Sequence, residues 1–538
     1  MDPYQTAPAN LPPPEVTSIH VKEFLKSFEV ERNYYARQET TSVLQVSRAA
    51  SAVAQVYERL RQAIDYQDEA VLRRRTIARI LTRRLTRTDE GAKVLAEGLI
   101  KELAWARYID YIVPSDKVDQ TAQILDRYLY LMKQTLYRQS DDLPNLREWI
   151  VGVCATEIER NLVPPFVYDA LALLMYQTLD FSERIEGVDE ATKNLQIYLA
   201  IQRTLLHADN ALMRYHLLTS YYPLWSTGDP ETLQRVTTQF VDTVRSIEYH
   251  LHHPLADRLF PLMRRQIGSY LIFKDVCTAH KKENLAVVLA EKNTREEYVR
   301  EQSRKRYGQV SAKIVNTVIR SIIFLFITKS LLALAIEIPV ERILTNKIHI
   351  VPLMVNVFFP PALMTVVALG IRPPGEKNTD KILDRINSMC EDSDGSQKIK
   401  FRMPPAKRRG GVFYLVYLAF FMLSFGLASY VLTKIGATLL SAVLFFMFTC
   451  LVSFFAYRIQ NNARELVVVD ERGTFVSGLF DFLFFPFMRI GRYLSEGISK
   501  INIFIFVFDF ILEAPIKSVT ALVEDWFSFV REKKEEIV

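Results

Sequence analysis

The sequence predicts an all-α protein: a cytosolic helical bundle or irregular α-solenoid, then four transmembrane helices in two hairpins, then amphipathic tail helices. Three observations support this prediction. Residues 1–310 are rich in Arg, Glu, Gln and Leu, residues 314–530 hold nearly all of the long uncharged stretches, and glycines and alternating β-type patterns are scarce. Stretches of about 20 apolar residues match the ~30 Å hydrocarbon core of a bilayer.

The N-terminal part of the chain is polar before it becomes helical. Residues 1–40 include three consecutive prolines, and we expect a mostly disordered tail with a short helix near Val21–Phe28. Residues 41–310 are expected to form one cytosolic all-helical domain. Apolar residues at spacings of three and four between Val46 and Ala63 predict a helix that either forms a short coiled coil or packs within its own bundle.

A strongly basic amphipathic helix follows this seam. Six arginines are candidate contacts to anionic lipid or to an acidic partner, namely Arg73, Arg74, Arg75, Arg79, Arg83 and Arg84. A solvated basic face is the alternative. The whole chain carries a net charge of only +6. Nucleic-acid binders are usually more basic, so no nucleic-acid partner is expected.

The second hairpin, within residues 412–460, is the clearest membrane element. Val412–Leu432 and Ala437–Tyr457 contain no charged side chain, and only Thr433–Gly436 separate them. Each stretch is long enough to cross the hydrocarbon core at ~1.5 Å per residue. Tyrosines lie at the ends of both stretches, where aromatic rings prefer the membrane interface.

The first hairpin, residues 311–371, contains an interrupted second span. Ile348–Ile371 is uncharged but contains Asn356, Pro360 and Pro361. Because proline removes a backbone donor and clashes with the preceding turn, we expect a kink or a break near the centre of this span. A tolerated kink has no functional meaning, whereas a discontinuous helix typically lines a polar cavity in a transporter.

The first span, Ile314–Ile338, is unusual because it contains Arg320, Lys329 and Glu337. Arg320 can reach the cytosolic headgroups, and Glu337 is expected at the outer end. Lys329 is deeper, where a charge costs at least about 2–3 kcal/mol. We therefore expect Lys329 to face protein or water; a tilted helix that lets its ammonium reach an interface is the alternative.

The distribution of basic residues predicts the orientation. Lysines and arginines are concentrated just before the first span and in the loop 372–411, whereas the opposite loops contain few. The positive-inside rule therefore places both termini and the basic loop in the cytoplasm. The inner leaflet that faces these basic segments is expected to be anionic.

The C-terminal region, residues 461–538, contains two apolar runs that are too short for ordinary spans, Phe475–Met488 and Ile501–Leu512. Runs of this length typically form interfacial, re-entrant or protein-buried segments. Asp509 has Glu513 four residues on, along the same helical face. Asp509 is the candidate to neutralise Lys329 if the second run packs against the spans; its exposure to headgroup water is the alternative.

Candidate chemistry outside the membrane is sparse. Residue types that bind metals gather in one region: Glu248, His250, His252, His253 and Asp257, with Cys277 and His280 further along. The tighter spacing of zinc motifs is missing, and no phosphate-binding, dinucleotide-binding or nucleophile-elbow motif occurs. We expect no metal, no cofactor and no enzymatic activity. The four cysteines are far apart and favour a reducing compartment.

Two parts of the chain carry a family resemblance. The stretches 489–495 (RIGRYLS) and 500–506 (KINIFIF), which runs into 513–515 (EAP), resemble large uncharacterised bacterial inner-membrane proteins. The segment 100–108 (IKELAWARY) is similar to them as well. The resemblance implies a bacterial membrane location, and it implies no activity or functional residue.

Domain proportions favour a membrane-anchored scaffold or adaptor, because more than half of the chain is a helical domain without recognisable chemistry. Its partner is expected to be another protein or a second copy of the chain. An oligomeric channel or transporter that uses the interrupted second span and Lys329 is the alternative. A membrane enzyme acting on lipid ranks third.

Overall fold

The computed structural model describes most of the chain in separate ranges. They are residues 18–38, 43–45, 69–87, 91–110, 112–181, 185, 187–346, 349–370, 374–392, 399–400, 410–463, 466–468, 475–500 and 526. The predicted seam from Val46 to Ala63, the second apolar run, Asp509 and Glu513 lie outside the described residues. The chain divides into two compact units; unit 2 includes Val16–Arg264 and Glu391–Met403, and unit 1 includes Arg265–Cys390 and Pro404–Ile503.

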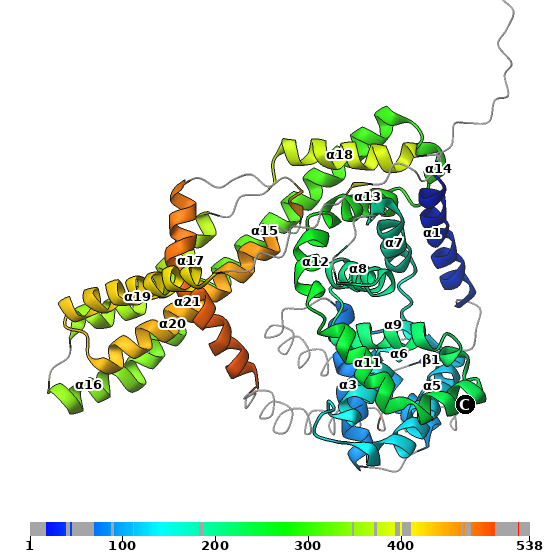
Figure 1. Ribbon diagram of the computed structural model, residues 1–538, viewed down its shortest axis with the longest axis horizontal. Helices are drawn as coiled ribbons and strands as arrows, with labels where there is room; N and C mark the ends of the chain where they lie inside the picture. Colours follow the sequence, from blue (N-terminus) through cyan, green and yellow to red (C-terminus); the bar gives the residue numbers. More distant parts are fainter. Residues whose placement is uncertain are drawn as a thin grey trace, which may run out of the picture. The chain divides into compact units, whose positions relative to one another are not determined.

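Unit 2 is a succession of helices joined by short turns (Figure 1). The helices are α1 (Ile19–Gln38), α3 (Glu69–Arg87), α4 (Ala92–Trp105), α5 (Ser115–Thr135), α6 (Leu146–Leu162), α7 (Phe166–Thr178), α8 (Glu190–Leu205), α9 (Asn210–Tyr221), α10 (Pro230–Thr238), α11 (Phe240–Leu251) and α12 (Leu255–Arg264), with the short 3₁₀ turns η1 (Leu136–Arg138) and η2 (Trp225–Thr227). The strands are only two or three residues long: β1 (Val43–Gln45) pairs antiparallel with β2 (Ile112–Pro114), and β3 (Leu179–Asp180) pairs parallel with β4 (Ile399–Lys400). The all-α prediction is confirmed.

Local sequence signals explain where these helices begin. The side chains of Asp189, Asp209 and Asp229 each accept a hydrogen bond from a backbone N–H in the first turn of the helix that follows. Pro230 is the first residue of α10, as expected after the cap at Asp229. Apolar residues on the inner faces of α4, α5, α6 and α11 then form a single core around Trp149 and Trp225.

The predicted N-terminal tail is wrong for residues 19–38. These residues form α1, which packs against α7 and buries Val21, Phe24 and Phe28. The apolar residues of α1 recur at three- and four-residue spacings, so the helix gains one buried face in spite of its polar composition. The short helix expected near residues 21–28 is therefore the centre of a longer one.

Unit 1 contains the membrane helices and a polar part. Its helices are α13 (Ile267–Ala279), α14 (Leu285–Val288), α15 (Lys292–Leu332), the π-helical segment η3 (Ala333–Glu337), α16 (Ile338–Thr345), α17 (Ile350–Leu369), α18 (Glu376–Glu391), α19 (Gly411–Lys434), α20 (Leu439–Ala463) and α21 (Phe475–Lys500). Among the described residues, four helices are long and apolar enough to cross a membrane: Lys292–Ile343, Ile350–Leu369, Gly411–Lys434 and Leu439–Gln460. These helices indicate a membrane protein, and they coincide with the four predicted spans.

The predicted domain boundary at residue 310 differs from the observed one. The compact unit that holds the spans begins at Arg265, because α13 packs against the N-terminal half of α15. Arg306 on α15 forms an ion pair with Asp275 on α13. The span helix thus continues as a rigid stem outside the membrane, and α13 belongs to that stem.

The basic loop 372–411 contains the amphipathic helix α18, which is fastened to the same stem. The buried Arg295 of α15 donates to the carbonyl of Leu289 at 2.6 Å and to Oδ1 of Asn387 on α18 at 2.8 Å. Asn378 donates to the hydroxyl of Tyr307 and to the carbonyl of Leu466, at 2.9 Å each. These bonds hold α15, α18 and the segment after α20 together.

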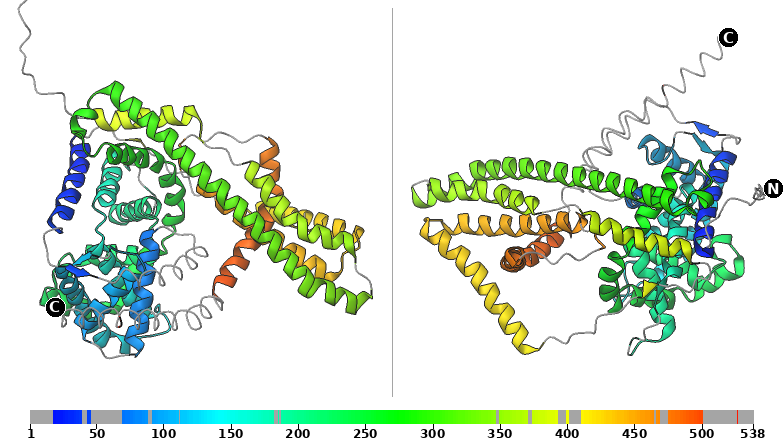
Figure 2. Two further views of the ribbon diagram at one scale, coloured as in Figure 1. Left: turned by 180° about the vertical axis from the view of Figure 1, so that it is seen from behind. Right: turned by 90° about the horizontal axis from the view of Figure 1, so that it is seen from above.

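Three of the spans, α15, α17 and α20, pack around an apolar core that includes Val318, Met364 and Val452. Helix α21 packs against α20 and crosses it (Figure 2). Helix α19 joins α20 through a tight turn at Gly436, whose φ of 78° suits a glycine. In the right view of Figure 2, α19 leads away from α20 at an angle.

Of the kink or break predicted for the second span, the break is not observed, and a kink stays a prediction. Helix α17 continues through Pro360 and Pro361 as a single helix of 20 residues. Proline lacks the N–H that would bond to the carbonyl four residues earlier, so these prolines leave the carbonyls of Asn356 and Val357 without their regular helical donors. Pro360 and Pro361 are both buried inside the bundle, and this packing keeps the helix intact.

The first apolar run of the C-terminal region belongs to a helix, α21, that continues through Pro486. It approaches α20 so closely at Gly491 that a Cβ there would lie 2.0 Å from the carbonyl oxygen of Cys450. Phe487 stacks near Phe425 of α19, with ring centroids 4.5 Å apart. Phe487 of this run is buried, whereas Phe485 is 48% exposed. The interfacial, re-entrant and protein-buried settings therefore all stay predictions.

Candidate functional site in the membrane helices

The first span contains a π-helical turn, and the nearby Pro339 explains why the turn occurs at this position. Segment η3 is followed closely by Pro339, which has no N–H and would clash with a carbonyl one α-helical turn earlier. A π turn, in which the bond spans five residues, relieves this conflict by inserting one extra residue into the turn. Turns of this kind are frequent at functional sites.

The π turn aligns a stripe of buried residues at four-residue spacing: Lys329, Ala333, Glu337 and Glu341. On a regular α-helix, positions four apart drift by ~40° per step, so three steps would turn Glu341 by about 120° from Lys329. The extra residue of the π turn takes up about 100° of this drift. All three charged side chains of the stripe are therefore buried inside unit 1.

Glu337 is the centre of a polar cluster that joins three helices. Its Oε1 accepts a hydrogen bond from the hydroxyl of Ser441 on α20 at 2.8 Å and one from Nδ2 of Asn356 on α17. Asn356 Nδ2 also donates to the hydroxyl of Ser441 at 2.8 Å and to its carbonyl at 3.0 Å. Glu337, Asn356 and Ser441 are each only 1% exposed.

In the side-chain amide of Asn356, the nitrogen has hydrogen-bond partners and the oxygen has none within the described residues. Its Oδ1 is buried and has no hydrogen-bond partner among the described residues. The backbone carbonyl of the same residue lost its regular donor to Pro360. Two acceptor oxygens of one residue thus point to a missing donor beside Glu337, because a buried acceptor without a donor is destabilising.

Lys329 lies about two turns before Glu337 and is completely buried. Its Nζ lies 4.1 Å from the ring centroid of Phe448 on α20, close enough for a cation–π contact. The described residues provide no hydrogen-bond partner for this Nζ. Glu337 is the acid that acts electrostatically on it. Lys329 therefore lacks the hydrogen bonds that normally accompany a buried ammonium.

Buried hydroxyls extend the polar groups along α20 beyond Lys329. Thr449 and Ser453 are four residues apart, buried, and within the described residues neither side-chain oxygen has a hydrogen-bond partner. At the opposite end, buried Glu341 accepts a hydrogen bond from the backbone N–H of His349 at 3.1 Å. Its Oε1 lies 3.6 Å from Nδ1 of the same histidine. The polar groups thus form a lane that runs along the bundle.

Sequence reasoning identified part of this site. It singled out Lys329 by its depth and Asn356, Pro360 and Pro361 by their effect on the second span. It missed Ser441, and it did not foresee that Glu337, expected at the outer end of the span, is buried in the bundle. The four-residue spacing from Lys329 to Glu341 was the available signal, but without the π turn that spacing does not keep one face. Asp509 and Glu513 lie outside the described residues.

Several of the candidate lipid-binding arginines of α3 form ion pairs with acids inside unit 2. Arg73 and Arg74 are buried, and they pair with Glu159 and Asp209. Arg83 and Arg84 both pair with the buried carboxylate of Glu102. Arg75 is exposed and Arg79 is partly buried. Acids of the same chain therefore bind at least Arg73, Arg74, Arg83 and Arg84, and the role of the six arginines toward lipid stays a prediction.

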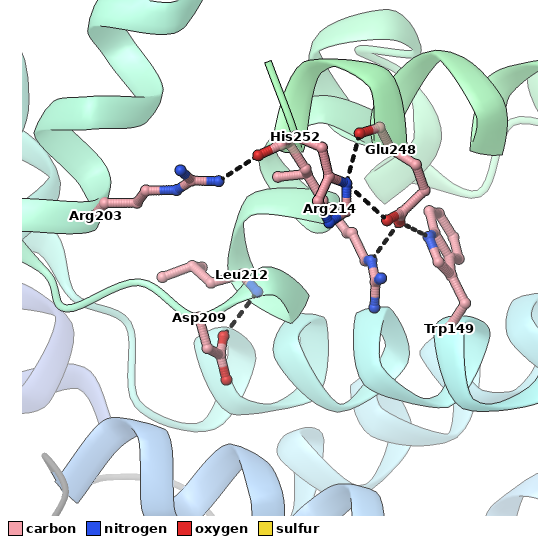
Figure 3. A network of polar contacts seen from close by, with 8 residues as sticks. Trp149, Arg203, Asp209, Leu212, Arg214, Glu248 and His252 are labelled. Atoms are coloured by element: carbon pink, nitrogen blue, oxygen red, sulfur yellow. Dashed lines mark hydrogen bonds and ion pairs between the residues drawn. The ribbon is translucent and has the colours of Figure 1, made fainter. Parts of the chain in front are cut away.

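The suspected metal-binding region is a structural ion-pair network (Figure 3). The carboxylate of Glu248 accepts hydrogen bonds from Nε1 of Trp149 at 2.9 Å and from Nε of Arg214 at 2.7 Å, and Nδ1 of His252 lies 3.8 Å away. A metal ligand would need those lone pairs. Within the described ranges, no group of His, Cys, Asp and Glu side chains is placed to hold a metal ion.

A buried histidine gives unit 2 a defined pH dependence. Burial and the charges of Arg160 and Arg74 lower the pKa of His216 from 6.5 to about 3. The unfolded chain binds a proton below pH 6.5 while the folded chain does not, so stability falls as the pH decreases. Between pH 7.5 and 5.5, we expect a loss of about 1.4 kcal/mol from this residue.

The measurement is urea unfolding of the full chain in detergent, followed by tryptophan fluorescence at both pH values. The variant His216→Gln should lack this part of the pH dependence. Replacement of exposed His252 by Gln is the matched control and should leave the slope unchanged. Equal slopes for the parent chain and His216→Gln would contradict the buried neutral state.

No protein-family model, curated protein or solved structure matches this chain.

Proposed function

We propose that the membrane helices form a translocation site for a small ion, centred on Glu337, Asn356 and Ser441 and extended by Lys329. The observation that carries this proposal is a buried acid and a buried amine on one helix face, beside acceptor oxygens without donors. An ionisable side chain inside a membrane bundle costs about 2–3 kcal/mol or more, and such residues are typical of ion pathways.

Purely structural roles for these residues are less favourable. A stabilising polar network would satisfy every member, whereas here Nζ of Lys329 and Oδ1 of Asn356 have no partner within the described residues. Replacement of such groups by apolar residues would make a better-packed core. Three spans with a short apolar core leave little room for a wide pore, so a small ion suits the site better than a bulky solute.

The test is ion flux through the full-length chain in liposomes. Vesicles are given a potassium potential with valinomycin, and movement of Na⁺, Cl⁻ and H⁺ is followed separately; K⁺ movement is followed under a sodium gradient without valinomycin. We expect the parent chain to carry at least one ion and Glu337→Gln to reduce that flux at least tenfold. Arg342→Gln, an exposed charge on the same helix, is the matched control and should keep it. A parent chain that moves none of the four ions would overturn the proposal.

A second candidate function is partner binding by unit 2, which a surface feature favours. Tyr137 is 73% exposed. Arg138 lies 5.3 Å from its ring centroid and is itself anchored to the carbonyl of Thr237 at 3.0 Å. A pre-organised Tyr–Arg pair is typical of interaction hot spots. The scaffold or adaptor role, with a protein or a second copy of the chain as partner, rests on this pair.

Native mass measurement of the assembly in mild detergent tests this second role. We expect a stoichiometric partner or a dimer with the parent chain and its loss with Tyr137→Ala. Tyr221→Ala, which truncates another exposed tyrosine of unit 2, is the control. A monomer mass for the parent chain would exclude a stable partner.

A further inference from the structure

We propose that the ion carried by this site is the proton, and that it passes along a lane formed by Glu341, Glu337 and Lys329. This inference rests on the proposed translocation function and names its substrate. It follows from three features of the site: which atom occupies the centre of the oxygen cluster, which groups line the bundle, and how these groups are spaced.

The centre of the oxygen cluster is already filled by an N–H donor. Nδ2 of Asn356 donates to Oε1 of Glu337 and to both the hydroxyl and the carbonyl of Ser441. A sodium or potassium ion would have to sit where these oxygens converge, and the positive end of the amide occupies that place. A proton needs no such space, because it binds to one carboxylate oxygen of Glu337.

Lys329 gives a second reason to favour the proton over a metal cation. When charged, its buried ammonium repels a metal cation that enters the bundle, with little water to screen it. The same group can release and take up a proton. Lys329 therefore acts as a barrier to Na⁺ and K⁺ and as a relay for H⁺, which is the usual division for lysines, acids and histidines in proton pathways.

The spacing of these groups fits a relay with intervening water. Glu341 and Glu337 are one turn apart, ~6 Å along the axis, and Lys329 is a further ~12 Å away. The buried hydroxyls of Thr449 and Ser453 continue the lane and provide sites for bridging water. At the other end, His349 contacts Glu341 at 3.6 Å. His349 is the one group of the lane that is about one-third exposed, so it meets solvent first.

The transfer needs no other reactant. A proton on His349 passes to the carboxylate of Glu341 and then to Glu337. The ammonium of Lys329 releases its own proton to water toward Thr449 and Ser453, and the resulting amine takes up the proton of Glu337 through bridging water across the ~12 Å between them. Only O–H and N–H bonds form and break, and each group returns to its starting state. The titratable groups of the lane around Glu337 are Lys329, Glu341 and His349. The charged groups Arg342 and Lys434 near the same end are exposed and take no part in the transfer.

Proton flux into liposomes with the full-length chain tests the inference. A trapped pH dye reports H⁺ uptake under a potassium potential, with Na⁺ and Cl⁻ replaced by impermeant ions. We expect potential-driven uptake that Glu337→Gln and Glu341→Gln each lower at least tenfold, while Glu337→Asp keeps a measurable part. Arg342→Gln should match the parent chain. His349→Gln should lower the uptake, because it removes the group through which protons enter the lane.

The outcomes separate this inference from the proposed function. Flux of Na⁺, K⁺ or Cl⁻ that depends on Glu337, without proton uptake, would leave the translocation site standing and overturn the proton as its ion. Proton uptake that Glu337→Gln and Glu341→Gln leave unchanged would overturn the lane. Absence of flux for every ion would overturn both. Each variant is also passed over a size-exclusion column in detergent. An elution volume equal to that of the parent chain shows that the variant is folded and that its loss of flux has another cause.

Discussion

Replacement of Gly491 by Ala should separate α21 from α20. A Cβ at this position would lie 2.0 Å from the carbonyl oxygen of Cys450, 2.6 Å from its carbonyl carbon and 2.9 Å from Cβ of Phe454. Two of these atoms belong to the backbone, so no side-chain rotation relieves the clash. Overpacking typically costs about 1–3 kcal/mol, and close helix contacts in membranes depend on small residues. We expect a loss at the upper end of that range.

Cysteine labelling in the membrane measures this effect directly. Cys450 is 1% exposed, and the shift of α21 should make its thiol reactive toward a maleimide in Gly491→Ala, and more so in Gly491→Leu. Gly426→Ala is the matched control, because a Cβ there meets no atom within 4 Å. If Gly491→Ala labels no faster than Gly426→Ala, the two helices do not cross at Gly491.

Replacement of Glu157 by Ala should strongly destabilise unit 2. The buried carboxylate of Glu157 accepts hydrogen bonds from the hydroxyl of Tyr128 at 2.7 Å, from Nε1 of Trp225 at 3.0 Å and from Arg127. Its loss removes the acidic partner of the Arg127 guanidinium and one of the two acceptors of the Trp225 indole N–H, which also donates to the hydroxyl of Tyr128 at 3.1 Å. Breaking a buried charge pair in this way costs about 3–5 kcal/mol.

Urea unfolding followed by tryptophan fluorescence measures this loss, since Trp225 reports on the site itself. Glu157→Gln keeps an acceptor oxygen but removes the charge, so it should lose less stability than the alanine variant. Asp126→Asn, which removes an exposed acid next to Arg127 in sequence, is the control and should change stability by less than about 0.5 kcal/mol. Similar midpoints for Glu157→Ala and Asp126→Asn would contradict the network.

The membrane helices were predictable because their signal is local. A run of about 20 apolar residues has no favourable place in water, whatever surrounds it, so length and composition alone identified the four spans. The same argument identified Lys329 as exceptional. Reasoning from composition misjudged residues 19–38. Their modest apolar stripe packs against α7, and this burial stabilises a helix in spite of the polar composition.

Pro360 and Glu337 show the other limit of local reasoning. Proline at position 360 predicted a kink or a break, and α17 continues as one helix because the bundle encloses the proline. Glu337 was predicted only from its position near the outer end of the span, and its burial among Asn356 and Ser441 could not be foreseen from that position. Both outcomes depend on residues that are distant in sequence.

The all-helical fold, the four apolar spans and the deep lysine follow from the sequence alone, since hydropathy and helix period act over a few turns. The polar site follows only from the tertiary structure. Glu337, Asn356 and Ser441 come from three helices and lie up to 104 positions apart in the sequence. Their charges and unpaired oxygens are removed from water only when those helices pack together.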